Sequence, residues 1–178
     1  MRKIVLTFGL IAGAFLSAMM LITLKFQDQI GFDKGETIGY TTMVLAFLMV
    51  FFGVKSYRDN VAGGSVTFGR AFMVGLFITT VASLCYVATW ELVYYELAPD
   101  FADKYAAYVV DKAKKSGATD AQIAAQTKQM TEFTEMYKNP LVNVALTLLE
   151  PLPVGLVLTL VTAGVLSRKR RAEGAAVT

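Results

Sequence analysis

Two glutamates and one lysine are the residues of this sequence best placed to do chemistry. Glu91 and Glu150 each lie in a long apolar segment, and Glu150 stands within the stretch LTLLEPLPVGLVLTLV. Lys25 ends a third apolar segment. Ionisable side chains in such segments are costly, and they usually bind a cation, carry a proton or pair with an opposite charge. One interpretation is therefore a polar pocket in which Glu91 and Glu150 are cation or proton sites and Lys25 is their partner.

The positions of these residues support a second, structural interpretation. A hydrocarbon core is crossed by roughly 20 helical residues. Counted forward from Arg70, this length ends near Glu91. Counted back from Arg168, it ends near Glu150. Both carboxylates would then lie among the lipid headgroups at one boundary of the membrane, level with Lys25 and either solvated or paired with lysine. We favour this interpretation, because a charge at the interface costs far less than one at the midplane.

The composition leaves out the usual catalytic and metal-binding groups. There is no histidine, so the commonest general base and metal ligand is missing. The single cysteine, Cys85, cannot form an internal disulfide, and no nucleophile stands beside a base. The glycines of the stretch NVAGGSVTFGRAF lack the spacing of a phosphate-binding loop. We therefore predict a non-enzymatic protein with no catalytic residues, no metal site and no cofactor.

The elements that must position the two glutamates are membrane helices. Hydrophobic residues make up 55% of the 178 residues and charged residues 17%, and the mean hydropathy is +0.51. Soluble proteins carry nearer to about a quarter of charged residues. Apolar segments long enough for a membrane helix cover residues 4–24, 38–54, 71–95 and 141–166. The sequence therefore predicts an all-α, integral membrane four-helix bundle, formed by one domain over residues 1–178.

The first of these segments has an alternative interpretation as a signal peptide. Arg2 and Lys3 precede it, as positive residues precede the apolar core of a signal peptide. Its apolar stretch is longer than the roughly 7–15 residues of such a core, and no cleavage motif of small residues follows. We therefore interpret this segment as a membrane helix.

The positive charges predict the orientation of the helices. With the amino terminus inside, every arginine of the sequence falls on the inner side, and the outer side carries only lysines mixed with most of the acidic residues. The positive residues of the inner side are Arg2, Lys3, Lys55, Arg58, Arg70, Arg168, Lys169, Arg170 and Arg171. The positive-inside rule therefore predicts that both termini are cytoplasmic. Because topology explains these basic residues, we predict no nucleic-acid partner.

Residues 98–138 are predicted to form an amphipathic helical hairpin on the outer side, between the third and fourth membrane helices. Gly117 suits the end of its first helix, and Thr119 with Gln122 forms the capping-box pattern that begins its second helix. One face of each helix is marked by residues at helical spacing: Phe101, Tyr105, Tyr108, Val109, Ile123, Thr127, Met130, Phe133 and Tyr137. These faces must lie on each other, on the membrane surface or on a partner.

Pro151 and Pro153 predict a bend at the outer rim of the fourth membrane helix. Each proline lacks the amide that would bond to the carbonyl four residues earlier. The freed carbonyls need water, a side chain or a neighbouring helix. The bend would turn residues 141–149 away from the membrane normal and leave Glu150 at the point of entry. An ion site in a broken helix is the alternative interpretation.

Small residues recur at four-residue spacing in three of the membrane helices. Gly9 and Gly13 share one face of the first helix, while Gly75 and Gly155 belong to similar faces of the third and fourth. Such faces allow helix backbones to approach closely. We predict that these glycines pack the helices of one bundle, with homodimerisation through Gly9 and Gly13 as the alternative.

Several stretches carry a resemblance to a known family. They are GGSVTFGRAFMVGL at residues 63–76, the tyrosine-rich end of the third helix, EMYKNP at the end of the hairpin, and LEPLPVGLVLTLVTAGVLSRK at residues 149–169. With these stretches the chain resembles the bacterial membrane family catalogued as domain of unknown function 4199. The resemblance implies a four-helix integral membrane protein of the bacterial envelope. It implies no activity and no catalytic residue.

Together these features predict a multi-pass protein of the bacterial inner membrane that acts by binding or assembly. Its expected partners are the lipid bilayer and, through the outer hairpin, another protein or a second copy of the chain. The alternative is a small transporter or channel component, in which Glu91 and Glu150 line an outer-facing polar vestibule. Such a component would need to oligomerise, because four helices are few for a complete carrier.

Overall fold

A computed structural model describes residues 1–167, and the predicted inner-side residues Arg168, Lys169, Arg170 and Arg171 lie outside this range. Within residues 1–167, every regular element is a helix. In chain order the elements are α1 (Arg2–Lys25), α2 (Gln27–Ile30), α3 (Phe32–Asn60), α4 (Phe68–Leu92), η1 (Val93–Leu97), α5 (Phe101–Lys115), α6 (Asp120–Tyr137), α7 (Pro140–Leu149) and α8 (Pro151–Leu166). In this part of the chain, four helical segments are long and apolar enough to cross a membrane: α1, α3, α4 with η1, and α7 with α8. The fold is all-helical, and these segments suggest a membrane protein.

The helix α3 extends beyond the apolar segment that predicts it. The sequence predicts residues 38–54, whereas α3 covers Phe32–Asn60. The additional turns carry polar residues, among them Asp33 and Arg58. Apolarity marks only the part of a helix that fits the hydrocarbon core, while its backbone hydrogen bonds continue into polar surroundings. Gly31, with a φ of 75° that glycine adopts readily, separates α2 from α3.

The third membrane segment ends in a π-helical turn. At the start of α4, the Thr67 side chain accepts a hydrogen bond from the backbone N–H of Arg70. At the other end the helix continues as η1, in which the N–H of Ala98 reaches the carbonyl oxygen of Val93 at 2.7 Å. A π-turn closes its hydrogen bond over five residues instead of four, so it is wider than an α-turn. The chain leaves the membrane-length segment here and turns into α5.

The fourth membrane segment is interrupted at Glu150. The helix α7 ends at Leu149, and α8 begins with Pro151. The backbone N–H of Glu150 reaches only the carbonyl oxygen of Thr147, at 3.4 Å. Pro153 lies in the first turn of α8, where backbone amides have no partner within the helix in any case. The two prolines therefore begin a helix rather than distort the middle of one, and Glu150 stands at the junction.

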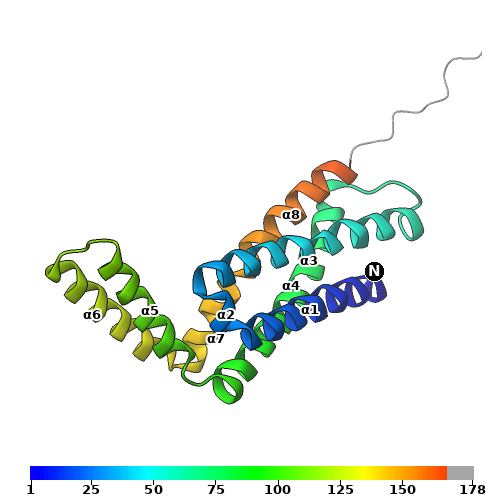
Figure 1. Cartoon of the computed structure of the whole chain (residues 1–178). Coiled ribbons are helices and arrows are strands. Elements are labelled where there is room, and N and C mark those ends of the chain that lie inside the picture. The colour runs from blue at the N-terminus through cyan, green and yellow to red at the C-terminus, as the bar shows by residue number, and fades with distance from the viewer. Residues whose placement is uncertain (168–178) are drawn as a thin grey trace, which may run out of the picture.

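The helices α4 and α8 approach each other through small residues and threonines. A Cβ atom added to Gly155 would lie 2.4 Å from Cγ2 of Thr79, and one added to Gly75 would lie 2.9 Å from Cγ2 of Thr159. The hydroxyls of Thr79 and Thr159 are hydrogen-bonded at 3.1 Å. Neither glycine can therefore be enlarged without moving a neighbour. Figure 1 shows the resulting bundle, in which α1, α3, α4 and α8 run alongside one another.

Gly9 and Gly13 bring α1 against α4 in the same way. A Cβ atom on Gly9 would lie 2.7 Å from the Cβ of Val81, and one on Gly13 would lie 2.6 Å from the Cβ of Cys85. Both glycines are buried within one chain. Gly9 and Gly13 therefore leave no exposed surface through which two copies of the chain could pack as a homodimer.

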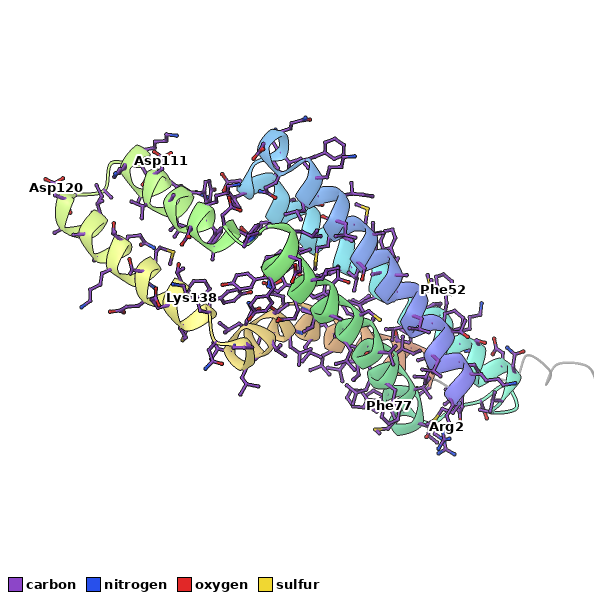
Figure 2. The ribbon with its side chains drawn as sticks, turned by 90° about the horizontal axis from the view of Figure 1, so that it is seen from below. Arg2, Phe52, Phe77, Asp111, Asp120 and Lys138 are labelled. Carbon is purple, nitrogen blue, oxygen red and sulfur yellow. The ribbon has the colours of Figure 1, made fainter. Side chains whose placement is uncertain are left out.

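The outside of the bundle is rich in exposed hydrophobic side chains. Leu10 of α1 and Leu84 of α4 are 53% and 58% exposed. Phe52 and Phe77, labelled in Figure 2, are also exposed. A soluble monomer rarely leaves large apolar patches uncovered. In lipid such side chains are the favourable ones, so this surface agrees with four membrane-spanning helices.

The helices α5 and α6 pack on each other beyond one end of the bundle (Figure 1). Gly117, with a φ of 82°, follows the end of α5. Thr119 and Gln122 form a capping box at the start of α6, as the sequence predicts. Asn139 then caps α7 by accepting the N–H of Leu141. Local capping chemistry therefore sets the ends of these helices.

The α5–α6 pair is joined to the bundle at its base. A small apolar core there contains Tyr94, Ala102 and Tyr137, with Trp90 and Phe133 packed against it. The tip of the pair, marked by Asp111 and Asp120, and the first residues of α1, marked by Arg2, lie at opposite ends of the molecule (Figure 2).

Candidate functional site

A cavity of about 700 Å³ lies where the bundle meets α5 and α6. We call it the junction cavity. The last turns of α1 and α4 and the first turns of α3 line it, together with residues of α2, α5, α6 and α7 and with Glu150. Most of these side chains are aliphatic or aromatic. Small-molecule sites in proteins usually have volumes of about 300–1,000 Å³ and mostly apolar walls, so the junction cavity has the size and character of a ligand site.

Glu150 lies on the floor of the junction cavity. Its Oε2 accepts a hydrogen bond from the hydroxyl of Tyr86 at 2.6 Å. Tyr86, Leu16 and Met43 are the lining residues of α4, α1 and α3 that lie farthest from the α5–α6 end of those helices. The carboxylate that the sequence singles out is therefore held at the cavity wall by a tyrosine of α4, and Glu150 itself is exposed.

Glu91 and Lys25, the other two predicted site residues, do not line the junction cavity. Lys25 is exposed at the end of α1. In α4, the cavity is lined by Tyr86 and Trp90, and each residue of an α-helix is turned by about 100° from the one before it. Glu91 therefore faces another direction, and its Oε1 is buried without a hydrogen-bond partner among residues 1–167. The structure brings only Glu150 of the three to this cavity.

Aromatic rings close the cavity between α3 and α5. The ring centroid of Phe32 lies 4.9 Å from that of Tyr108 and 5.5 Å from that of Tyr105. The ring of Phe101 lies 5.7 Å from the same phenylalanine. Rings at these separations attract one another. All four rings line the cavity, so the aromatic face of α5 is turned toward it.

An ion pair joins α3 and α5 beside these rings. The Nζ of Lys112 lies 2.5 Å from Oδ1 of Asp33 and 5.6 Å from the ring centroid of Tyr108. The hydrogen bond to Asp33 raises the pKa of the Lys112 ammonium, which therefore stays charged. Both side chains are exposed, and both residues line the cavity. This ion pair is thus a solvent-accessible link between α3 and α5 at one edge of the cavity.

A hydrogen-bond network joins α4, α6 and α7 at the base of the α5–α6 pair. The Nε1–H of Trp90 donates to Oη of Tyr137 at 2.8 Å and to Oδ1 of Asn143 at 3.2 Å. The Thr147 hydroxyl lies 3.1 Å from Oη of Tyr137 and donates to Oδ1 of Asn143 at 3.2 Å. Burial raises the pKa of the Tyr137 phenol, which keeps its proton available to the network. Because Asn143 is fully buried, these bonds fix the end of α6 firmly against the bundle.

The sequence pattern alone does not point to these partners. It does mark the α7 side, because Asn143, Thr147 and Glu150 follow i, i+4, i+7 spacing along an apolar segment and so share one helix face. No comparable signal marks Tyr86, which lies 64 residues from Glu150 in the chain. Its contact depends on how α4 packs against the α7–α8 junction.

The cavity presents groups suited to binding. They are the Glu150 carboxylate, phenolic hydroxyls, aromatic rings and aliphatic side chains. Such groups accept hydrogen bonds, attract cations and exclude water. Within the described part of the chain, no three His, Cys, Asp or Glu side chains lie close enough together to hold a metal ion.

Comparison with known proteins places the chain in one family. A family model described as "Protein of unknown function (DUF4199)" matches residues 7–168, which is nearly the whole chain and includes the junction cavity. The resemblance seen in the sequence is thereby confirmed. No curated protein and no solved structure matches the chain.

Proposed function

The chain belongs to the DUF4199 family, and we propose that it is a non-enzymatic membrane protein that binds a small, largely apolar ligand in the junction cavity. One observation carries the proposal: a cavity of about 700 Å³, walled by apolar and aromatic side chains, lies between the bundle and the α5–α6 pair. Volumes and walls of this kind are typical of small-molecule sites.

The direction of the α5 aromatic face favours a small ligand over a protein partner. Phe101, Tyr105 and Tyr108 line the cavity. A partner protein or a second copy of the chain would need this face turned outward. The α5–α6 pair then serves as one wall of the site.

We place the protein in the bacterial inner membrane with both termini in the cytoplasm. Arg2 in α1, Arg58 in α3 and Arg70 in α4 belong to the helix ends that point away from α5 and α6. Arginine and lysine are enriched on the cytoplasmic side of membrane proteins. In this orientation the α5–α6 pair and the junction cavity lie toward the outer side of the membrane.

Trp90 provides a direct test, because it is the single tryptophan of the sequence and it lines the cavity. The full chain, purified in a bromine-free neutral detergent, would be titrated with bromoundecanol, whose bromine quenches indole fluorescence on contact. We expect saturable quenching. Gly39 lines the cavity, and a Cβ atom added to it would have nothing within 4 Å. Gly39→Phe should therefore fill the space and remove the saturable component.

Gly164→Phe is the matched control. Gly164 also lies inside a long helix with nothing within 4 Å of an added Cβ, but it does not line the cavity. This variant should be quenched as the wild type is. Quenching that rises without saturation, and equally in all three proteins, would show only partition of the probe into the micelle and would contradict the proposal.

A transporter or channel component is the second candidate function. The observation that favours it is the interruption of a membrane-length segment at Glu150, because broken helices with an acidic residue often form ion sites in transporters. Glu150→Gln would then abolish proton flux into liposomes containing the protein, read with a pH-sensitive dye, while expression stays unchanged. Equal flux in wild type, variant and protein-free liposomes would exclude this candidate.

A further inference from the structure

The acidic and basic residues of the junction cavity do not balance. The four that line it are Asp33, Glu36, Lys112 and Glu150. Lys112 pairs with Asp33, so these two charges compensate each other at the α3–α5 edge. Within residues 1–167, neither Glu36 nor Glu150 has an ion-pair partner. Two carboxylates therefore remain uncompensated in a cavity with mostly apolar walls.

Glu150 retains an oxygen atom for a ligand. Its Oε2 accepts the hydroxyl of Tyr86, while Oε1 has no hydrogen-bond partner among the described residues. The interruption before Pro151 holds this residue at the cavity floor, between the end of α7 and the start of α8. A carboxylate in apolar surroundings gains most from a positive partner. The floor of the cavity lacks one.

Aromatic rings share the junction cavity with Glu150. Tyr40, Tyr86, Trp90 and Phe133 line the cavity together with the rings of α5. The faces of aromatic rings attract cations, and tyrosine and tryptophan are the rings used to recognise ammonium groups. A carboxylate beside such rings favours an ammonium group and disfavours carboxylates and phosphates.

We propose that the ligand of the junction cavity is an amphiphilic cation, an alkyl or aryl amine or a quaternary ammonium compound. Its charged group pairs with Glu150 on the floor, and its apolar part lies between the aliphatic side chains at the end of α1 and the rings of α5. This inference rests on the proposed function, because it names the class of molecule that the same cavity binds. Charge complementarity selects the cation: a neutral chain would leave Glu150 unpaired, and an anion would face two carboxylates.

The test compares three probes with the same brominated chain and different headgroups. They are bromoundecyltrimethylammonium, bromoundecanol and bromoundecanoic acid, each titrated against Trp90 fluorescence of the full-length protein. We expect the cation to bind about tenfold more tightly than the alcohol, and the acid to bind most weakly. This comparison needs no variant, so it does not depend on whether a substituted protein folds.

Two variants then assign the preference to one carboxylate. Glu150→Gln keeps an oxygen that can accept the Tyr86 hydroxyl but removes the charge, so the cation should lose its advantage over the alcohol. Glu36→Gln, at the exposed start of α3, should retain most of the advantage. If Glu36→Gln removes the preference and Glu150→Gln does not, the assignment to Glu150 is overturned.

The outcomes separate this inference from the proposed function. Equal saturable binding of all three probes, or tightest binding of the acid, would overturn the inference that the ligand is an amphiphilic cation. The proposed function would stand, because the cavity would still bind a ligand. No saturable binding of any probe would overturn both. Preference for the cation that is lost in Glu150→Gln and kept in Gly164→Phe supports the inference.

Discussion

The two ends of the helix bundle are packed in opposite ways, although α4 belongs to both. Away from α5 and α6, the helices α4 and α8 are so close that a single methyl group on Gly155 would overlap Thr79. Toward α5 and α6, residues of α1, α3 and α4 line a cavity of about 700 Å³, and no residue of α8 belongs to its lining. The closed end is suited to holding the fold together, whereas the open end is suited to holding a ligand.

Residue type explains the difference between the two ends. The closed end is built from glycines and threonines at four-residue spacing, which allow backbones to touch. The open end carries Tyr86, Trp90 and the interruption at Glu150, and all three residues line the junction cavity. There, aromatic contacts and hydrogen bonds replace close backbone packing. Stability should therefore respond strongly to changes at the closed end and weakly to changes at the open end.

The largest effect is expected for Gly155→Ala at the closed end. The new Cβ would lie 2.4 Å from Cγ2 of Thr79 and 3.1 Å from the ring of Phe47, so one of the helices must move. We expect the free energy of unfolding to fall by about 1–3 kcal/mol. Circular dichroism during titration of the purified protein with sodium dodecyl sulphate would measure it.

Two further variants sharpen this prediction. Gly164→Ala places the same methyl group on the same helix, with no atom within 4 Å, and should not destabilise the protein. Thr79→Ser removes the overlapping Cγ2 but keeps the hydroxyl that bonds to Thr159, so it should restore part of the stability lost in Gly155→Ala. If Gly155→Ala and Gly164→Ala are equally stable, close packing at this end is not what stabilises the bundle.

A smaller effect is expected for Asn143→Leu, where the open end meets α6. The substitution removes an acceptor from both Trp90 and Thr147, although Tyr137 remains a partner for each of them. The loss is partly offset, because Nδ2 of Asn143 has no partner among the described residues. We expect a decrease of about 1 kcal/mol in the free energy of unfolding, together with a shift in Trp90 emission.

The control for this variant is Val144→Leu, which introduces the same side chain at the neighbouring, more exposed position of α7. It should leave both stability and Trp90 emission unchanged. An Asn143→Leu protein that matches this control would mean that the network does not hold α6 against the bundle.

The smallest effect on stability is expected for Lys112→Gln at the rim of the cavity. The substitution removes the pair with Asp33, which is exposed and therefore contributes little to global stability. The expected result is an unchanged unfolding midpoint and faster amide hydrogen exchange in α5, because the tie from α5 to α3 is lost.

Lys115→Gln provides a matched comparison, because Lys115 pairs with Asp111 inside the same helix rather than with α3. Exchange in the first turns of α5 should stay as in the wild type for this variant. Equal exchange in both variants would show that the Asp33–Lys112 pair does not restrain α5.

Local patterns predicted the helices, their caps and the position of the break. The capping box of Thr119 and Gln122 and the interruption beside Pro151 depend on residues close together in the chain. The polar turns at both ends of α3 were not predicted, because the prediction rested on apolar residues. The backbone hydrogen bonds of that helix continue beyond the apolar segment.

The composition of the site was harder to predict. Counting residues gives the depth of Glu91 and Glu150 along their helices, but it does not give the direction in which each side chain points. Glu91 therefore shares a depth with the cavity without lining it. The partners of the site residues are also distant in sequence: Tyr86 lies 64 residues from Glu150, and Lys112 lies 79 residues from Asp33. Such pairs can be identified only from a structure that shows how the helices pack.

The π-helical turn of η1 makes the length of one short segment as important as its residues. If one residue were deleted from Val93–Leu97, an α-turn could replace the π-turn. Everything that follows would then rotate by about 100° about the axis of α4. Cysteines placed at Asp33 and Lys112 would no longer crosslink after such a deletion. Insertions and deletions, rather than substitutions, would thus decide which side of the bundle α5 and α6 cover.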